Sequence, residues 1–343
     1  MISEQKKIGV IQYGLGSIGS EMAKLVTTKP GLDLLGGVDL AEDKLGKNLS
    51  KIIGVEKILN SNVVPDLKQA LDNHKGDVVL HATKSSLKDI EKQLSEALEM
   101  GMNVISTSEE LSFPWIQNPE CSMRLDKLAK RKDVSILGVG INPGLILDSF
   151  VLALTGICAD IEEIIATRVV DASTRRLPLQ RKIGAGITTN EFQNRVDSGT
   201  ISHVGLIESF SMICEGLGLK VISVENILNP VIAKEDVNSK YIKVNAGQVT
   251  GIEQRISGMF DKNIILNLNL RMYLGAQEPY DEIIIKGTPN LNVRFDGGIS
   301  GDLATAAIAV NSIPRILNAP PGLITAKDLP MASAILGDVK YPT

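Results

Sequence analysis

Three glycines near the start of the chain have the spacing of a phosphate-binding turn. Gly14, Gly16 and Gly19 follow a short apolar run that predicts a strand, and residues 22–26 then take helical spacing. In such a strand, turn and helix, Gly14 allows the sharp turn, Gly16 lets backbone approach a pyrophosphate, and Gly19 lets the helix pack on the strand. The helix N-terminus offers N–H groups and a positive dipole end to the phosphates. The sequence therefore predicts a dinucleotide site built from Gly14, Leu15, Gly16, Ser17, Ile18 and Gly19.

An aspartate follows at the position where the adenosine ribose would be held. Leu32 to Val38 predict a second strand, and Asp39 ends it, about twenty residues after Gly19. Asp39 and the acidic residues 42 and 43 would repel a 2′-phosphate, and no arginine follows directly, so NAD is the expected cofactor. Lys44 keeps NADP open as the alternative. A structural turn followed by a surface aspartate is disfavoured by the complete order of strand, turn, helix, strand and acid.

Polar residues also follow three later strands of the same region. Thr83 follows a predicted strand at 77–82, Ser108 with Glu109 and Glu110 follows one at 103–106, and Asn142 follows one at 134–139. The carboxyl ends of parallel strands face the ligand crevice. We therefore expect Thr83 and Ser108 to contact the cofactor through their hydroxyls, and Asn142 to bind the nicotinamide amide or the substrate. Glu109 or Glu110 would accept a proton.

Each of these residues has a structural alternative. Glu109 and Glu110 could be an acidic pair that stabilises a helix N-terminus. Asn142 could be a cap or turn residue. The sequence does not separate the two glutamates, although Glu109 ranks first as the catalytic carboxylate. His81, inside a predicted strand, is expected to be a core histidine or to act behind the catalytic residues.

The order of elements predicts an α/β protein with two domains. Strands and helices alternate from residue 7 to about 145, with helices at 87–100 and 118–132, which indicates a doubly wound parallel sheet of Rossmann type. From 146 to 302 the pattern changes to a second α/β domain with an open mixed sheet. Its expected strands are 161–171, 221–226, 239–249, 264–273 and 281–286, and its expected helices are 190–197 and 204–216, after a basic loop at 172–186. An apolar helix at 303–318, ended or kinked by Pro314, is expected to pack back on the first domain (1–145).

Composition excludes several other classes of protein. The 343 residues carry a net charge of −4 and lack an extended basic cluster, which argues against a nucleic-acid partner. The cysteines, Cys121, Cys158 and Cys214, are far apart, so neither a disulfide framework nor a metal site is expected. The polar N-terminus and the absence of a long apolar run predict no signal peptide and no membrane partner. We expect a cytoplasmic protein with reduced thiols.

Five motifs, taken together, resemble a known family. They are 106–115 (STSEELSFPW), 140–144 (GINPG), 178–186 (PLQRKIGAG), 203–209 (HVGLIES) and 297–307 (GGISGDLATAA). They are similar to motifs of 2,4-diaminopentanoate dehydrogenase and the related native amine dehydrogenases. The resemblance implies a dihydrodipicolinate-reductase-like fold whose second domain binds substrate and forms a homodimer. It also implies reversible NAD(P)-dependent deamination of 2,4-diaminopentanoate to 2-amino-4-oxopentanoate and ammonia. Dihydrodipicolinate reductases have adjacent histidines, whereas the three histidines here are separate, which disfavours that reduction.

Amine oxidation gives the remaining polar residues expected roles. The amine must lose a proton before hydride leaves its carbon, and Glu109 is placed to accept that proton. The carboxylate of a diamino acid would pair with Arg181, which shares a basic loop with Arg175 and Arg176. His203 would touch substrate, although a surface arginine and a capping histidine are the alternatives. Two other functions stay open: a reductase of this fold that acts on an imine or aldehyde, and a non-enzymatic NADH sensor.

Overall fold

The structure is a computed structural model that describes residues 7–56, 59–71, 74–201, 204–261, 264–337 and 339. The chain divides into two compact units. The first is Met1–Leu145 together with Ser300–Thr343, and the second is Ile146–Ile299. Among the described residues, no helix is both long enough and apolar enough to cross a membrane.

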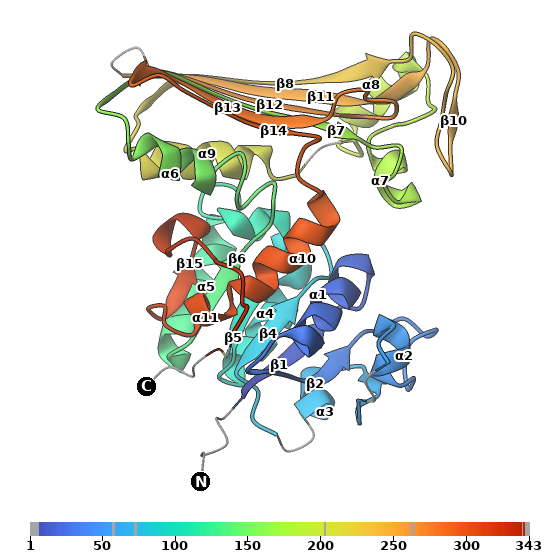
Figure 1. The fold of residues 1–343 in the computed structure, drawn as a ribbon, viewed down its shortest axis with the longest axis vertical. Helices are drawn as coiled ribbons and strands as arrows, with labels where there is room; N and C mark the ends of the chain where they lie inside the picture. The colour runs from blue at the N-terminus through green and yellow to red at the C-terminus, as the bar shows by residue number, and fades with distance from the viewer. Residues whose placement is uncertain are drawn as a thin grey trace. The chain divides into compact units, whose positions relative to one another are not determined.

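A seven-stranded sheet forms the centre of the first unit (Figure 1). Its strands pair in the order β15-β6-β5-β4-β1-β2-β3, and every pair is parallel. Six of them follow the strand order 3-2-1-4-5-6 of a dinucleotide-binding sheet, which confirms the predicted Rossmann fold. The strands are β1 (Ile8–Tyr13), β2 (Leu32–Val38), β3 (Val63–Val64), β4 (Val78–His81), β5 (Asn103–Ser106), β6 (Ser135–Gly138) and β15 (Gly322–Ile324).

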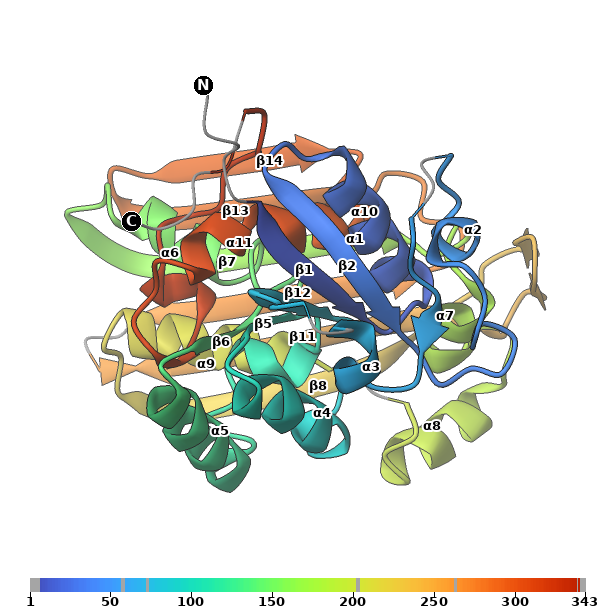
Figure 2. The same ribbon diagram turned by 90° about the horizontal axis from the view of Figure 1, so that it is seen from below.

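Helices cover both faces of this sheet (Figures 1 and 2). Alternate residues of β1 point to opposite faces, so Ile8 and Val10 belong to one hydrophobic cluster and Ile11 and Tyr13 to the other. The first cluster includes residues of α1 (Ser17–Thr28), α10 (Gly301–Asn311) and α11 (Ile313–Ile316), and the second those of α3 (Leu67–Leu71), α4 (Leu87–Glu99) and α5 (Pro119–Lys132). The short helix α2 (Leu49–Ile53) follows β2.

The predicted single helix at 303–318 is wrong in one respect, because it is two helices. α10 ends at Asn311 and α11 begins at Ile313, with Pro314 in its first turn. Pro314 has no N–H to continue the α10 hydrogen-bond ladder and is tolerated only near a helix start. The Ser312 hydroxyl donates to the Ile308 carbonyl (2.7 Å) at the junction.

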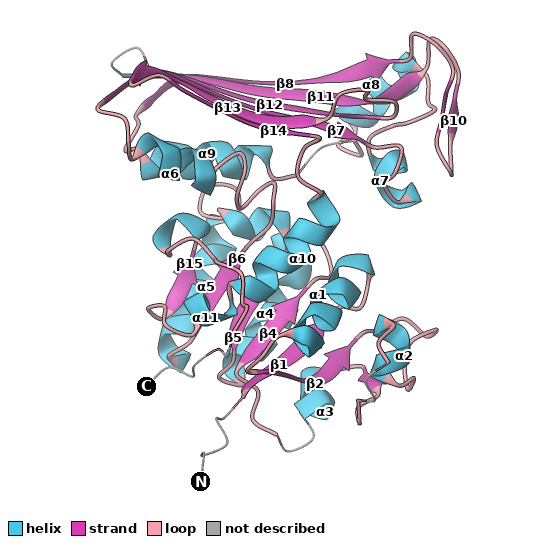
Figure 3. Ribbon diagram, in the orientation of Figure 1, coloured by secondary structure: helices cyan, strands magenta, loops and turns pink. Residues whose placement is uncertain are grey.

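The second unit contains a six-stranded mixed sheet, as predicted (Figure 3). The order is β14-β13-β7-β12-β11-β8, in which β7 and β12 are parallel and the other pairs antiparallel. The strands are β7 (Asp160–Asp171), β8 (Val221–Ile232), β11 (Val249–Phe260), β12 (Ile265–Tyr273), β13 (Tyr280–Thr288) and β14 (Leu291–Asp296); β9 (Val237–Asn238) and β10 (Lys243–Val244) form a separate hairpin. Helices α6 (Ser149–Thr155) and α9 (Leu206–Gly216) cover one face, while α7 (Leu177–Lys182) and α8 (Thr189–Asp197) lie near one end of the sheet.

Two sequence-based predictions for this unit fail. Residues 239–249 are not one strand, because the Ser239 hydroxyl accepts the Tyr241 and Ile242 N–H groups in a tight turn and Gly247 has a φ of +87°. The predicted loop at 172–186 contains α7. Two strands, β11 and β14, were not predicted from the sequence. In β11, Gly258 interrupts the apolar pattern, and a Cβ there would lie 2.6 Å from the Phe210 ring of α9.

Candidate active site

The three glycines of the first turn differ in what surrounds them. Gly14 has a φ of +87°, and a Cβ on it would lie 2.3 Å from the Ala82 carbonyl oxygen. A Cβ on Gly19 would lie 1.9 Å from the Gly14 carbonyl oxygen. By contrast, no heavy atom of another residue lies within 4 Å of a Cβ built on Gly16. Gly14 and Gly19 are therefore required by packing within the protein, whereas Gly16 leaves space that a ligand can enter.

The N-terminus of α1 adjoins this space. Gly16 is the N-cap residue, and no side chain caps the helix. The first N–H groups of an α-helix have no partner within it, and together with the helix dipole they form an anion site. Ser17 is exposed and Ile18 half-buried, while Leu15 is buried beneath the turn. These residues could hold a pyrophosphate, and that role stays a prediction.

Asp39 lies at the end of β2 beside the glycine turn. Its Oδ2 accepts the Leu15 N–H (2.8 Å) and the Lys44 ammonium (2.9 Å), and its Oδ1 accepts the Ala41 N–H (2.9 Å). Partial burial alone would raise the pKa of Asp39, but the hydrogen bonds from Ala41, Lys44 and Leu15 outweigh it and lower the pKa. Asp39 is therefore a carboxylate held next to the turn, where a ribose would meet it.

A buried histidine connects β4 and β5, the strands that precede the loops bearing Thr83 and Glu109. His81 Nδ1 lies 2.9 Å from Ser106 Oγ, and His81 Nε2 lies 2.9 Å from Gln93 Oε1. Because Gln93 Oε1 can only accept, Nε2 carries the proton, and Nδ1 accepts the Ser106 hydroxyl. Burial lowers the pKa of His81 to about 4, although the hydrogen bond to Gln93 opposes this, so the ring is neutral near pH 7. Thr83 also donates to Gln93 Oε1 (2.9 Å).

The loop after β5 is fixed by this network. Ser106 Oγ accepts the Ser108 N–H (3.1 Å), and the Ser108 hydroxyl donates to the Ser85 carbonyl oxygen (2.7 Å). The hydroxyls of Thr83 and Ser108, which were expected to contact the cofactor, thus make hydrogen bonds within the protein. The Ser108 hydroxyl joins the loops that follow β4 and β5, and the Thr83 hydroxyl joins the first of these loops to α4. The sequence alone did not identify this role, because Gln93 comes from a helix and the other residues from strands and loops.

The two glutamates of this loop have different surroundings. Glu110 Oε2 accepts the Leu87 N–H (2.7 Å) at the start of α4 and the Asn118 side-chain N–H (3.1 Å). The carboxylate of Glu109 is half-buried and has no hydrogen-bond or ion-pair partner among the residues that the structure describes. Glu110 therefore caps a helix, while the Glu109 carboxylate follows β5 without such a role, and its part in proton transfer stays a prediction.

Asn142 has a buried amide at the same edge of the sheet. It follows β6 in a tight turn, and its peptide bond to Pro143 is cis. Within the described part of the chain, both its Nδ2 and its Oδ1 are buried and lack a hydrogen-bond partner. A buried amide without partners is costly, so such a group is expected to meet a ligand. The carboxamide of a nicotinamide offers the donor and acceptor that complement it.

Two substrate-binding residues, Arg181 and His203, were predicted in the second unit. Arg181 lies near the end of α7 and is exposed. The buried Gln180 beside it donates to the Ala172, Ser173 and Arg175 carbonyls, which fixes the loop that bears Arg175 and Arg176. His203 lies outside the described residues.

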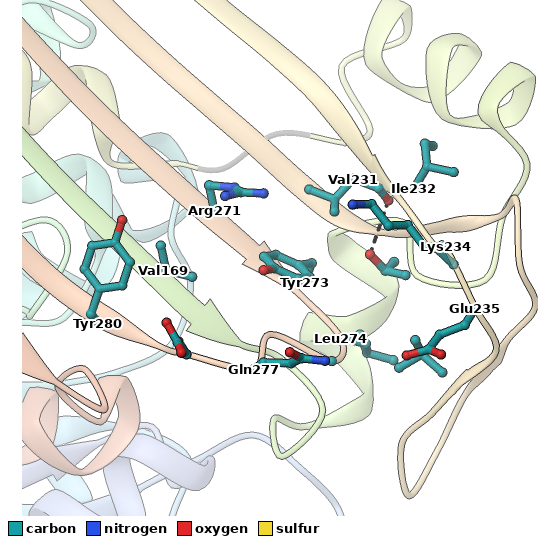
Figure 4. A pocket seen from close by; sticks show the side chains of 15 residues that line it. Val169, Val231, Ile232, Lys234, Glu235, Arg271, Tyr273, Leu274, Gln277 and Tyr280 are labelled. Carbon is teal, nitrogen blue, oxygen red and sulfur yellow. Dashed lines mark hydrogen bonds between the residues drawn. The ribbon is translucent and has the colours of Figure 1, made fainter.

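The second unit also contains an open pocket of about 630 Å³ on its sheet (Figure 4). Arg271, Tyr273 and Tyr280 lie along it, and Lys234 and Glu235 lie at its far end. None of the predicted site residues lines it. The predicted cofactor and proton-transfer residues instead gather at the carboxyl edge of the parallel sheet in the first unit.

Known proteins match this chain along almost its whole length. A family model described as the 2,4-diaminopentanoate dehydrogenase C-terminal domain matches residues 145–343. The 2,4-diaminopentanoate dehydrogenase of Acetoanaerobium sticklandii is 33% identical over 342 residues, which cover 98% of this chain and 97% of that protein. The chain belongs to the 2,4-diaminopentanoate dehydrogenase family. At the level of the family, it is an NAD(P)-dependent amine dehydrogenase and therefore an oxidoreductase.

Solved structures agree with this placement. The amine dehydrogenase from Mycobacterium smegmatis is 25% identical with a TM-score of 0.85, over 97% of this chain and 98% of that one. GenD2 from gentamicin A biosynthesis, solved in complex with NAD, is 16% identical with a TM-score of 0.55, over 94% of this chain and 90% of that one. The second likeness shows a shared fold. A nicotinamide cofactor fits the residues of the first unit, because Gly16 leaves open space and Asn142 has an unpartnered buried amide.

Proposed function

We propose that this member of the family oxidatively deaminates 2,4-diaminopentanoate at C4, with NAD as the preferred hydride acceptor. The products are 2-amino-4-oxopentanoate, ammonia and the reduced cofactor, and the reaction is reversible. The observation that carries the proposal is the likeness to the Acetoanaerobium sticklandii enzyme over 98% of the chain. The free Glu109 carboxylate at the carboxyl edge of the parallel sheet supports it from the geometry.

The cofactor would be held by the residues of the first unit. The turn from Gly14 to Gly19 and the N-terminus of α1 would bind the pyrophosphate, and Asp39 would accept the ribose hydroxyls. Asn142 would bind the nicotinamide carboxamide, which fixes the ring at the sheet edge. When bound there, NAD supplies the acceptor for the substrate hydride.

Glu109 would accept and release the protons that move during the reaction. An ammonium ion has no lone pair to stabilise the iminium that forms when hydride leaves its carbon, so Glu109 first takes a proton from the substrate amine. Loss of hydride then leaves the substrate as an iminium ion. After Glu109 has passed this proton to solvent, its carboxylate would act as a general base for the water that adds to this carbon. It would then return the water proton to the nitrogen, which departs as ammonia. The sum is one amine and one water converted to a ketone and ammonia, with a hydride passed to the cofactor and one proton released to solvent.

Substrate recognition would involve the second unit. The α-carboxylate of the diamino acid would pair with Arg181, because a guanidinium binds a carboxylate through two parallel hydrogen bonds. Asn142 and His203 would contact the remaining polar groups of the substrate. These assignments follow from the chemistry of the substrate and the positions of the family motifs.

We also propose a homodimer in the cytoplasm. The sheet of the second unit has one face that α6 and α9 cover and one on which paired charges alternate with apolar residues. Lys286–Glu163 and Arg255–Glu225 are ion pairs on that second face, beside Ile165 and Ile284. A balanced surface of this kind suits a two-fold contact between copies. The free thiols of Cys121, Cys158 and Cys214 are consistent with a reducing compartment.

The proposal is tested by measuring two products together. Purified protein with NAD and 2,4-diaminopentanoate should give NADH and ammonia in equal amounts. The matched control substrate is 2-aminopentanoate, which keeps the α-amino acid but lacks the amine at C4, and it should give neither product. Reduced cofactor without ammonia would instead favour another reductase of this fold. If no diamino acid or short amine releases ammonia, the proposed function is wrong.

A further inference from the structure

Lys44 is placed on a fixed turn directly beside Asp39. The Lys44 N–H donates to the Ala41 carbonyl (2.9 Å), and the Gly46 N–H donates to the Val63 carbonyl of β3 (2.9 Å). These bonds fix the backbone, so only the side chain of Lys44 is free to move. Its Nζ lies 2.9 Å from Asp39 Oδ2, and 23% of the Lys44 side chain is exposed against 13% for Asp39. A partly exposed ion pair therefore stands where the adenosine ribose is expected.

The carboxylate of Asp39 is close to saturated with donors. Two backbone N–H groups, from Leu15 and Ala41, and the Lys44 ammonium occupy three of its roughly four acceptor positions. A ribose with free 2′- and 3′-hydroxyls needs two of these positions. The backbone donors belong to the glycine turn and to the turn after β2, so they cannot withdraw. Lys44 is the one donor of the three whose withdrawal requires only a rotation of its side chain.

We propose that Lys44 is a specificity-determining residue that leaves Asp39 when the cofactor binds and pairs with the 2′-phosphate of NADP. With NAD, the released Asp39 accepts the ribose diol, and Lys44 turns to solvent. With NADP, the Lys44 ammonium offsets the repulsion between the phosphate and the acidic residues Asp39, Glu42 and Asp43. The site therefore binds both cofactors. This inference rests on the cofactor site of the proposed function, and it adds the residue that sets the cofactor range.

Direct binding measurements test this inference without turnover. Titrations of NADH and NADPH followed by cofactor fluorescence would be made on the wild type, Lys44→Met, Lys44→Arg and Lys51→Met. Lys44→Met should weaken NADPH binding about tenfold or more, because a charge-assisted hydrogen bond is lost. Its NADH affinity should stay the same or rise, which also shows that the variant is folded. Lys44→Arg should retain NADPH binding.

A control variant and a cofactor fragment distinguish the effect of net charge from that of direct contact with the 2′-phosphate. Lys51 is exposed on α2, so Lys51→Met makes the same change in net charge and should leave both affinities unchanged. Calorimetric titration with 2′,5′-ADP and with 5′-AMP isolates the 2′-phosphate, and Lys44→Met should lose affinity for the first only. Equal losses for NADH and NADPH would overturn the inference, as would a wild type that binds NADH but not NADPH. Neither of these two results would contradict the proposed function. Binding of both cofactors without ammonia release overturns the proposed function instead.

Discussion

His81 Nδ1 lies 2.9 Å from Ser106 Oγ, and the two residues occupy paired positions on the parallel strands β4 and β5. The hydrogen bonds run in one direction, from the Ser108 N–H to Ser106, from the Ser106 hydroxyl to His81, and from His81 Nε2 to Gln93. This direction requires a neutral imidazole, because a protonated ring could not accept from Ser106. The loop that bears Glu109 is thus positioned by a histidine that does not itself need to touch substrate.

His81 should make the stability of the protein depend on pH. Its folded pKa is about 4 against 6.5 for an unperturbed histidine, so below pH 6.5 the unfolded chain takes up a proton that the native protein does not. The stability is complete above pH 6.5 and falls as pH drops toward 4, by on the order of 3 kcal/mol for such a shift. Urea unfolding from pH 4 to 7.5 should show this slope, and His81→Asn should have a shallower one. His74→Asn, at an exposed position, is the control and should keep the wild-type slope. Parallel slopes for wild type and His81→Asn would contradict the assignment.

Replacing Glu109 should lower turnover, whereas replacing Glu110 should lower stability. Glu109→Gln should lower kcat by about a hundredfold or more, the usual contribution of a general base, with NADH affinity unchanged. At high pH, where more substrate amine is already neutral, part of that loss should be recovered. Glu110→Ala should retain turnover within a few-fold but lower the free energy of unfolding by about 1 kcal/mol, because the start of α4 loses its cap. The reverse pattern would assign proton transfer to Glu110.

Much of the first unit could be predicted from the sequence because its information is local. Strands and helices alternate with strong periodicity, and Gly14, Gly16, Gly19 and Asp39 have a spacing that one supersecondary unit dictates. The second unit was harder to predict. β11 carries Glu253 and Arg255 on one face, and its glycines make room for Phe210 and Tyr273. Because these features depend on neighbouring elements, the sequence of β11 alone does not predict a strand.

The site shows the same division between local and non-local information. Its position at the strand ends follows from the order of elements, and so did the expectation that a glutamate lies there. The distinction between Glu109 and Glu110 depends on Leu87 and Asn118, which lie 23 and 8 residues from Glu110 along the chain. The role of His81 depends likewise on Gln93, and only the folded chain brings these residues together.

Gly19→Ala should destabilise the protein, whereas Gly16→Ala should weaken cofactor binding. Gly19→Ala places a Cβ 1.9 Å from the Gly14 carbonyl oxygen, so the strand and helix must separate, and the melting temperature should fall by several degrees or more. Gly16→Ala meets no atom within 4 Å, and its φ of −68° suits alanine, so the protein should fold normally. Its Cβ enters the space expected for the pyrophosphate, and NADH binding should weaken tenfold or more. Thermal melts and NADH titrations check both variants, and unchanged NADH affinity in Gly16→Ala would place the pyrophosphate elsewhere.

A buried ion pair should dominate the stability of the second unit. Arg168 and Asp281 are 4% and 1% exposed, and Arg168 Nη1 donates to both Asp281 oxygens at 2.8 Å. The same pair fixes the backbone of Ile299, because Asp281 accepts its N–H (2.7 Å) and Arg168 donates to its carbonyl (2.6 Å). Removing one partner leaves a buried charge without compensation, so Arg168→Met or Asp281→Asn should each cost about 3–5 kcal/mol of unfolding free energy.

The double variant distinguishes a net attraction from the cost of an orphaned charge. Arg168→Met with Asp281→Asn removes both charges, so it should cost clearly less than the sum of the two single changes, with the lost contacts to Ile299 as the remainder. Arg255→Met breaks the exposed pair with Glu225 and should cost no more than about 1 kcal/mol. Urea denaturation of the full chain measures all four variants. Additive losses would contradict this expectation, because they would show that the buried and hydrogen-bonded Arg168 and Asp281 contribute independently to stability.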